Sequence, residues 1–433
     1  MTENKQDAIS VGTTHDKTVG ATGRSPLPDG WRWVRLGDVI ADAQAGFASG
    51  KRDPNGVIQL RMNNVDTRGN LVWNDVIRVP ADAETIDHYR LVVGDVMFNN
   101  TNSIDLVGKS ALFEGYNEPV VFSNHFTRIR PKGDVLISEF LASWLNHQWL
   151  KGVFANICNR WVGQSAVKYD RLMKIDFPLP PIPEQQRIAS ILREQMAAVE
   201  KARKAAEERL EAVNALPAAF LRQVFPQPGQ PLPDGWKWVR LGDVCEFCRG
   251  PFGGSLRKDI FVKSGYPVYE QSHAIYKDFG NFRYYIDGRK YIEMSRFRVT
   301  PGDLIMSCSG TMGKVAVITK DAPEGIINQA LLKLTPTAKV ISAFLVFSIQ
   351  SPTFQQTIEA LTLGAAIKNV ASVSIIKRIS IPLPPLSEQQ RIVAILREQM
   401  AAVEKARKAS EEELAAINAL PAALLRRAFS GEL

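Results

Sequence analysis

The residues of this chain that could do chemistry do not form a catalytic set. Cys245-x-x-Cys248 has the spacing of zinc ligands, but no second pair of cysteines or histidines lies near it. Residues 309–314 (SGTMGK) hint at a phosphate loop but lack the G-x-x-x-x-G-K-[ST] frame. The five histidines are scattered without partner spacing. We therefore predict no catalytic residue and no metal site in this chain, and we interpret the two cysteines as small buried side chains.

Several short polar segments are instead typical of nucleic-acid binding. Residues 46–52 (GFASGKR) and 249–258 (RGPFGGSLRK) are small-residue loops with cations, which can bring backbone N–H groups and Lys or Arg to phosphates. Later in each half, a Gly-Asp turn and a short strand precede a polar loop and a lysine, whose side chains can hydrogen-bond base edges. The candidate DNA-binding residues are Ser49, Lys51, Arg52, Arg61, Asn63, Asn64, Asn99, Asn100, Thr101, Ser103 and Lys109 in the first half, and Arg249, Ser255, Arg257, Lys258, Gln271, Ser272, His273, Ser307, Ser309, Thr311 and Lys314 in the second.

Each of these loops has an alternative explanation, because Asn, Ser and Gly are also the ordinary composition of turns. For any single loop the two interpretations are equally good. The loops occupy equivalent places in the two halves with different side chains, and this favours recognition for the set as a whole.

The loops are embedded in a frame that occurs twice. The segment PLPDGWRWVRLGDV, residues 26–39, returns as residues 231–244 with one substitution in fourteen positions. Residues 177–225 and 381–429 match at 37 of 49 positions without a gap. Between the matched segments the halves barely resemble one another. The sequence therefore predicts two units of nearly equal length, in which repeated segments flank regions of different sequence.

The second repeat has the pattern of a long helix. A proline-rich segment, 177–183, precedes helix formers that run to Leu216, and about 32 residues would give a rod of about 48 Å. Pro217 and Pro421 are expected to kink or end each rod. Apolar and small residues at steps of three and four predict a coiled-coil seam. The seam residues are Ile188, Leu192, Val199, Ala202, Ala206 and Val213 in the first copy, and Ile392, Leu396, Val403, Ala406, Ser410 and Ile417 in the second.

Each helix has an immediate partner in the other copy, so we expect two antiparallel rods with pseudo-two-fold symmetry. The alternative is that each helix packs on its own domain. Strand-like runs separated by Gly, Asn and Asp fill 40–176 and 245–381, and residues 138–156 look helical. The predicted fold class is α+β, with two mixed α/β domains joined by two long antiparallel helices. The predicted boundaries are 1–25 (disordered leader), 26–176 (first domain), 177–225 (central helical spacer), 226–381 (second domain) and 382–433 (C-terminal helical spacer).

Composition indicates an ordinary globular protein with a basic bias. The chain has 433 residues, 45% of them apolar, and a net charge of +8. Residues 184–225 contain seven Lys or Arg against six Glu, so the excess of cations lies in the two domains. This favours a polyanion as partner of the domains and protein as partner of the helices, although a mildly basic protein without such a partner has the same charge. Four cysteines make no disulfide framework and no apolar run could span a bilayer, so we expect a cytoplasmic location.

The repeated motifs resemble those of the specificity subunit of type I restriction–modification systems. The similarity rests on PLPDGW-x-W-x-x-LG-D-V, on GD[VL] with its polar loop and lysine, on P-L-P-P-x-x-EQQRI-x-x-IL, and on the final SGEL. The resemblance implies two target recognition domains that each read half of a bipartite, gapped site in double-stranded DNA. It also implies that the helices set the gap and dock two methyltransferase subunits, and that motor/nuclease subunits join them. No cofactor is expected in this chain; S-adenosylmethionine, ATP and Mg are implied for the partners.

Two other classes of function remain open from the residues. A tandem DNA-binding regulator would need the same loops and helices but no enzyme partner. A self-contained DNA methyltransferase or nuclease would need a cofactor motif, and the chain has neither a G-x-G-x-x-G after a strand nor the Asp/Asn-Pro-Pro-aromatic tetrad.

Overall fold

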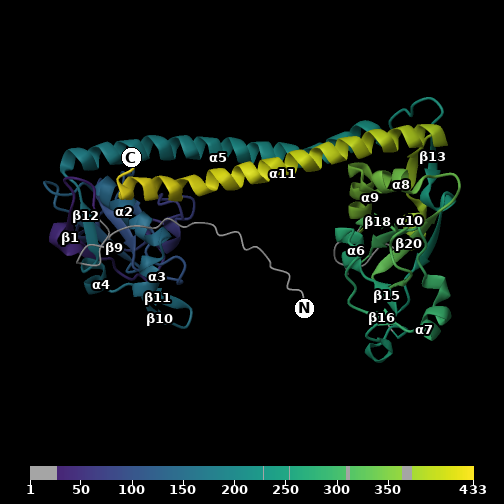
Figure 1. The fold of residues 1–433 in the computed structure, drawn as a ribbon, viewed down its shortest axis with the longest axis horizontal. Coiled ribbons are helices and arrows are strands. Elements are labelled where there is room, and N and C mark those ends of the chain that lie inside the picture. The colour runs from purple at the N-terminus through teal and green to yellow at the C-terminus, as the bar shows by residue number, and fades with distance from the viewer. Residues whose placement is uncertain (1–26, 228, 253, 309–312, 363–372) are drawn as a thin grey trace, which may run out of the picture. The chain divides into compact units, whose positions relative to one another are not determined.

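The computed structural model describes residues 27–433 except 228, 253, 309–312 and 363–372. The expected leader, Ser309 and Thr311 lie outside the described residues. Contacts divide the chain into two units, Met1–Ala205 with Leu414–Leu433, and Ala206–Glu413. Each unit thus contains one variable domain, the start of the long helix that follows this domain, and the end of the other long helix (Figure 1).

Two of the sheets of the first unit form the body of its domain. A four-stranded antiparallel sheet has the order β2-β9-β5-β7, and a three-stranded sheet has the order β4-β3-β8 with β3 and β8 parallel. Its strands are β1 (Arg32–Arg35), β2 (Ile40–Ala45), β3 (Val57–Leu60), β4 (Ile77–Val79), β5 (Val96–Asn99), β6 (Thr101–Asn102), β7 (Ser110–Leu112), β8 (Val120–Phe122), β9 (Phe126–Pro131), β10 (Asn159–Trp161), β11 (Gln164–Ala166) and β12 (Asp176–Leu179). Its helices are η1 (Leu36–Val39), η2 (Met62–Asn64), α1 (Ala83–Tyr89), α2 (Ser138–Leu150), α3 (Val153–Ile157), α4 (Tyr169–Met173) and the beginning of α5 (Ile182–Val224).

The core of the first unit lies between the four-stranded sheet and α2. Phe98 and Ile129 of the sheet pack with Phe140 and Trp144 of the helix, all of them fully or almost fully buried. The sequence indicated one helix over 138–156, but Gly152 is left-handed, with φ of 71°, and divides it into α2 and α3. Glycine adopts this conformation at no steric cost, so the break is local to one residue.

The second unit repeats this topology with different residues. Its sheets have the orders β14-β20-β17-β18 and β16-β15-β19, and β15 and β19 are parallel. The strands are β13 (Lys237–Arg240), β14 (Cys245–Arg249), β15 (Tyr266–Tyr269), β16 (Tyr285–Ile286), β17 (Leu304–Ser307), β18 (Val315–Val317), β19 (Ile326–Ile327), β20 (Leu331–Pro336) and β21 (Ser380–Leu383). The helices are η3 (Leu241–Asp243), η4 (Lys258–Ile260), α6 (Gln271–Tyr276), α7 (Gly288–Glu293), η5 (Ser295–Phe297), α8 (Ser342–Gln350), α9 (Pro352–Thr362), α10 (Val373–Arg378) and the beginning of α11 (Leu386–Ser430).

The short repeat has one structural role in both units. Strand β1 pairs with β12, with Trp33 opposite Pro178, and β13 pairs with β21 in the same register, with Trp238 opposite Pro382. Each two-stranded sheet therefore joins the beginning of a domain to the segment that leads into its long helix. This shared role is consistent with the near-identity of the repeated segments in the two halves.

The long helices pack against each other in both units. In the first unit Ile188 and Leu192 of α5 share a core with Leu425 and Ala428 of α11. In the second unit Leu221 of α5 and Phe225, the residue after the end of α5, share a core with Ile392 and Leu396 of α11. Because the start of one helix meets the end of the other each time, the helices are antiparallel (Figure 1).

Neither helix ends at its internal proline. The helix α5 continues through Pro217 and α11 through Pro421. A proline removes one backbone hydrogen bond from a helix. Leu221 and Phe225 beyond Pro217 are buried in the core of the second unit, and this packing holds the last turns helical despite the lost bond.

The predicted seam residues differ in burial. The buried ones are Ile188, Leu192, Ala206, Ile392, Leu396, Val403 and Ser410, and the half-buried ones are Val199, Val213, Ala406 and Ile417. Ala202, also predicted for the seam, is exposed. Its neighbour Arg203 is the more enclosed residue, with a side chain 17% exposed that forms an ion pair with Glu200.

In the part of the chain that the structure describes, no helix is long and apolar enough to cross a membrane.

Candidate nucleic-acid interface

The loops predicted to bind DNA in the first unit converge at one turn, residues 123–125, between β8 and β9. The N–H of Gly46 donates to the carbonyl oxygen of Phe126 over 3.1 Å, and that of Ser123 donates to Leu60 over 2.9 Å. The N–H of Asn100 donates to His125 over 3.0 Å. Strands β2, β3 and β5 therefore all end at this turn, and we name it the hub of the first unit.

The second unit has the same convergence at residues 328–330, its hub. The N–H of Gly250 donates to Leu331 over 2.9 Å, that of Asn328 to Tyr269 over 3.0 Å, and that of Cys308 to Ala330 over 2.9 Å. The ends of β14, β15 and β17 thus meet as their counterparts do. Sequence reasoning placed the loops at strand ends but did not predict either hub, since the hub residues belong to no motif.

Two glycines allow this close approach. A Cβ atom on Gly46 would lie 2.3 Å from the carbonyl oxygens of Phe122 and Ser123, and one on Gly250 would lie 1.8 Å from that of Asn328. No side chain fits at such distances from backbone atoms. Gly46 and Gly250 therefore position their loops against the hubs, a role distinct from phosphate contact.

The asparagine-rich segment of the first unit is largely turned inward. Asn99 is fully buried and donates from Nδ2 to the carbonyl oxygens of Thr101 and His125, at 3.2 and 3.0 Å. Asn100 donates to the hydroxyl of Thr127 over 3.1 Å and accepts from that of Thr101 over 2.7 Å. The prediction that these amides face bases is therefore corrected for Asn99. Ser103 is exposed, and Asn100 and Thr101 are half-buried.

The candidate DNA-binding residues around η2 all form hydrogen bonds or ion pairs with Asp75. Arg61 forms an ion pair with its carboxylate over 3.3 Å, and Asn63 donates to it over 2.8 Å. Asn64 is buried and its amide closes the turn by accepting from the N–H of Arg61 and donating to Val72 and Asp75. Asn64 is thus structural, while Arg61 and Asn63 remain near the surface, where a DNA phosphate could compete with Asp75.

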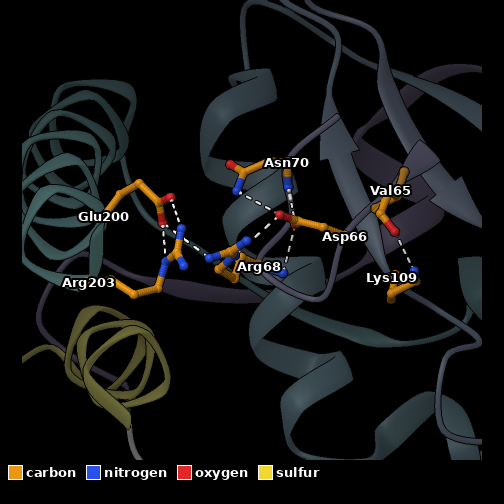
Figure 2. Close-up of polar contacts among 7 residues, drawn as sticks. All are labelled: Val65, Asp66, Arg68, Asn70, Lys109, Glu200 and Arg203. Carbon is orange, nitrogen blue, oxygen red and sulfur yellow. Dashed lines mark hydrogen bonds and ion pairs between the residues drawn. The ribbon is translucent and has the colours of Figure 1, made fainter. Parts of the chain in front are cut away.

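Lys109 contradicts the prediction made for it. Its side chain is buried, with the residue 5% exposed, and its ammonium donates to the carbonyl oxygen of Val65 (Figure 2). Burial lowers the pKa of this ammonium, and the nearby Asp66 opposes that shift. An ammonium in this place cannot reach a phosphate, so Lys109 supports the loop that follows η2. Lys314 is exposed, as a DNA contact requires.

A chain of charges connects the same loop to helix α5 in the first unit (Figure 2). The carboxylate of Asp66 accepts from the N–H groups of Arg68 and Asn70 at 2.8 and 2.9 Å. Arg68 forms ion pairs with Asp66 and with Glu200 of α5, both at 3.3 Å. The pKa of Glu200 lies below its usual value, first because Arg203 donates to it. These ion pairs fix the position of the loop that follows η2 relative to α5.

In the second unit the segment 271–273 lies beside a cavity of about 490 Å³ at the hub. His273 is buried, with Nδ1 accepting from the N–H of Glu270 over 2.8 Å and Nε2 lying 2.9 Å from the carbonyl oxygen of Asn281. Both ring nitrogens are occupied, so the predicted base contact of His273 is corrected to a structural one. Gln271 and Ser272 line this cavity together with Asn281, Arg283 and Asn328.

Ser307 is likewise buried and accepts from the N–H of Lys314 over 3.0 Å, which closes its loop. The candidate residues that the structure leaves exposed are Lys51, Arg52, Asn63 and Ser103 in the first unit, and Ser255, Arg257, Lys258, Ser272 and Lys314 in the second. Ser49, Arg61, Asn100, Thr101, Arg249 and Gln271 are half-buried. Sequence reasoning missed Asn124 and Gln329, exposed residues of the two hubs.

The Gly-Asp turns are structural in both units. Asp95 is almost fully buried, accepts from the N–H of Val92 over 2.9 Å and forms an ion pair with Arg130 over 2.5 Å. Asp303 accepts from the hydroxyls of Thr300 and Thr335 at 2.8 and 2.5 Å. Each carboxylate ties the turn to the neighbouring strand. The motif therefore positions the polar loop that follows it.

The geometry of Cys245 and Cys248 does not fit metal binding. Both lie on β14, three residues apart, so their side chains point to opposite faces of the sheet. Burial raises the pKa of Cys245 to about 12, which keeps it a thiol at neutral pH. Among the described residues, no group of three His, Cys, Asp or Glu could hold a metal ion.

Comparisons with known proteins agree with the doubled architecture. A family model described as "Type I restriction modification DNA specificity domain" matches residues 28–209 and again 233–412. The chain is 26% identical over 412 residues to a putative type I restriction enzyme MjaX specificity subunit of Methanocaldococcus jannaschii, covering 88% of this chain and 92% of the relative. It is 24% identical over 198 residues to the type I restriction enzyme StySPI specificity subunit of Salmonella potsdam, covering 45% of this chain and 42% of that protein.

Solved structures show the same fold. The HsdS subunit from Thermoanaerobacter tengcongensis is 26% identical, with a TM-score of 0.59 over 95% of this chain and 99% of that chain. A chain from a structure described as the basis of complex assembly and conformational transition of the type I R-M system is 26% identical, with a TM-score of 0.75 over 95% of this chain and 100% of that chain. Two matched domains, long antiparallel helices and loops that converge on two hubs assign this chain to the family of type I restriction–modification DNA specificity proteins.

Proposed function

We propose that this chain is the non-catalytic DNA-recognition subunit of a type I restriction–modification complex. Each domain reads one half of a bipartite site in double-stranded DNA, through the loops at its hub. Helices α5 and α11 set the gap between the half-sites and dock two methyltransferase subunits, and motor/nuclease subunits complete the complex. The complex acts in the cytoplasm, where its DNA lies.

The observation that carries this proposal is the convergence of the loops. In each unit three strands end at the same turn, and the exposed candidate DNA-binding residues there have hydrogen-bonding or cationic side chains. The loop of the second unit also exposes the apolar side chain of Phe252. Such side chains suit base edges and phosphates. The backbone that presents them is the same in both units while the side chains differ, which is what reading two different half-sites on one frame requires.

The cofactors of the reaction belong to the partners in this proposal. S-adenosylmethionine is bound by the methyltransferase subunits, and ATP with Mg by the motor/nuclease subunits. Binding of S-adenosylmethionine by the purified chain alone would contradict this division and would favour a self-contained methyltransferase. A chain that binds DNA but co-purifies with no methyltransferase would favour a tandem regulator.

The central test is to map N6-methyladenine genome-wide in cells with and without this chain. We expect methylation at one bipartite motif that disappears with the chain. Replacing residues 245–381 by those of a relative should change one half-site and leave the other intact. If both half-sites change, the domains do not read independently and the proposal is wrong in its modular form.

The spacer role is tested by adding seven residues to each long helix. The insertion in α5 lies between Ala205 and Ala206, and the one in α11 lies at the equivalent place, between Ala409 and Ser410. Seven residues preserve the seam and lengthen each helix by about 10 Å, close to three base pairs at about 3.4 Å each. We expect a wider gap between unchanged half-sites. Altered half-site bases with the original gap would contradict the spacer role.

A further inference from the structure

An exposed hairpin in the first unit belongs to no motif that the sequence analysis identified. Strands β10 and β11 form it, with Trp161 opposite Gln164 and a turn at Val162 and Gly163. Trp161 is 60% exposed and Val162 fully exposed. Two adjacent exposed apolar side chains at the end of a projecting hairpin gain nothing in the isolated unit, and they form a small apolar contact surface at its tip.

The hairpin is joined to the segment predicted to read bases. Strand β11 pairs with β6, with Ser165 opposite Asn102 and Ala166 opposite Thr101, and the order of the three-stranded sheet is β10-β11-β6. Side chains alternate between the two faces of a strand, so Trp161 and Asn159 share one face of this sheet with Thr101. The apolar tip and the half-buried Thr101 therefore belong to one continuous surface.

The charge around the hairpin favours a polyanion. Between residues 151 and 175 the exposed cations are Lys151, Arg160, Lys168, Arg171 and Lys174, and the acid is Asp170. Arg160 and Arg171 donate to the backbone carbonyls of Ala155 and Ile157, which fixes both guanidinium groups without neutralising them. In Figure 1 the hairpin lies at the end of the first unit away from helices α5 and α11.

We propose that the β10–β11 hairpin is a further DNA-contacting element, and that Trp161 and Val162 enter a groove of the duplex and pack against the bases of the first half-site. The inference rests on the proposed function and adds an apolar contact to it. Cations flank the tip and hold phosphates, while Trp161 stacks on a base or wedges between two. Apolar wedges of this kind locally unstack a duplex, and the free energy of the added protein–DNA contacts offsets the free energy of unstacking.

The experiment uses the full chain assembled with its methyltransferase partner, and a duplex that carries the mapped site. Fluorescence anisotropy gives the dissociation constant for the wild type, Trp161→Ala, Trp161→Phe and Val162→Ser between 50 and 200 mM salt. We expect Trp161→Ala to weaken binding by about tenfold, as loss of a base–aromatic stack does, with an unchanged salt slope. Trp161→Phe should retain most of the affinity because it keeps an aromatic face, and Val162→Ser should weaken binding less than Trp161→Ala.

The matched control is Ile292→Ala, which removes an exposed apolar side chain, 69% exposed, from helix α7 of the second unit. It should bind as the wild type does. Wild-type affinity of both Trp161→Ala and Val162→Ser would overturn the inference while leaving the proposed function intact. Loss of the methyltransferase from Trp161→Ala with unchanged affinity for DNA would also overturn it, in favour of a protein contact. A wild-type complex without preference for any site would instead refute the proposed function.

Discussion

The side-chain amide of Gln185, at the start of α5, accepts a hydrogen bond from the backbone N–H of Ile137 over 2.9 Å, immediately before helix α2. The same amide donates to the carbonyl oxygens of Val135 and Pro180, at 2.8 and 2.9 Å. Gln389 repeats the arrangement in the second unit with Ile341, Lys339 and Pro384. This residue of the EQQRI motif thus fastens each long helix to its domain.

Replacing Gln185 by Ala should destabilise the first unit by about 2–3 kcal/mol, because it leaves buried backbone groups without partners. Scanning calorimetry should show a lower unfolding temperature. The matched control is Gln186→Ala at the exposed neighbouring position. Equal stabilities of the two variants would show that the fastening contributes nothing.

Gly46→Ala and Gly250→Ala should each weaken DNA binding, since the added Cβ would collide with the hub backbone and displace the loop. We expect a loss of at least tenfold in affinity, with the methylation motif disturbed in only one half-site for each variant. Gly50→Ala and Gly254→Ala are the controls in the same loops, because nothing lies within 4 Å of their added Cβ atoms. Comparable losses in the controls would mean that loop flexibility, not close approach, is what matters.

Lys109 and Lys314 should respond differently to substitution by alanine. Lys109→Ala should lower the free energy of unfolding by about 1–3 kcal/mol, because the carbonyl of Val65 loses its buried donor. Its direct effect on the salt dependence of DNA binding should be nil. Lys314→Ala should leave stability unchanged and flatten the slope of log K against log salt by about one unit, as loss of a phosphate contact does. Relaxed base choice with an unchanged slope would make Lys314 a base reader instead.

His147 should make the first unit sensitive to mild acid. Burial, with a contribution from Lys151, lowers its pKa from 6.5 to about 4, and its ring stacks on Phe429. The unfolded state therefore binds more protons between these values, and stability should fall as the pH drops from about 6.5 to 4. The loss should reach at most about 3 kcal/mol. The free energy of unfolding of His147→Gln should depend less on pH than that of the wild type over this range. Parallel curves of stability against pH for the two proteins would show that His147 is not the group responsible.

The parts of the fold predicted from sequence are those with local periodicity. Ile188, Leu192, Ile392 and Leu396 recur at helical steps, so the antiparallel helices followed from the pattern and from its second copy. The sequence did not predict that α5 continues through Pro217. The packing that holds its last turns involves Phe225 in the core of the second domain, which begins later in the chain.

Side-chain roles at the candidate site depend on distant partners. The burial of Lys109 is set by Val65, 44 residues earlier, and no local feature distinguishes it from the exposed Lys314. The hairpin around Trp161 escaped notice for the same reason, because β11 pairs with Thr101 and Asn102, far earlier in the chain. Loop composition indicated which segments gather, but not which of their side chains face outward.

Each long helix contributes residues to the cores of both units, and this has a consequence for biosynthesis. Phe140 of the first domain packs edge to face against Phe429 at 5.2 Å, and Leu425 and Ala428 belong to the same core. These residues leave the ribosome only after the whole second domain has been made. The core of the first unit can therefore be completed only after the second domain has been translated.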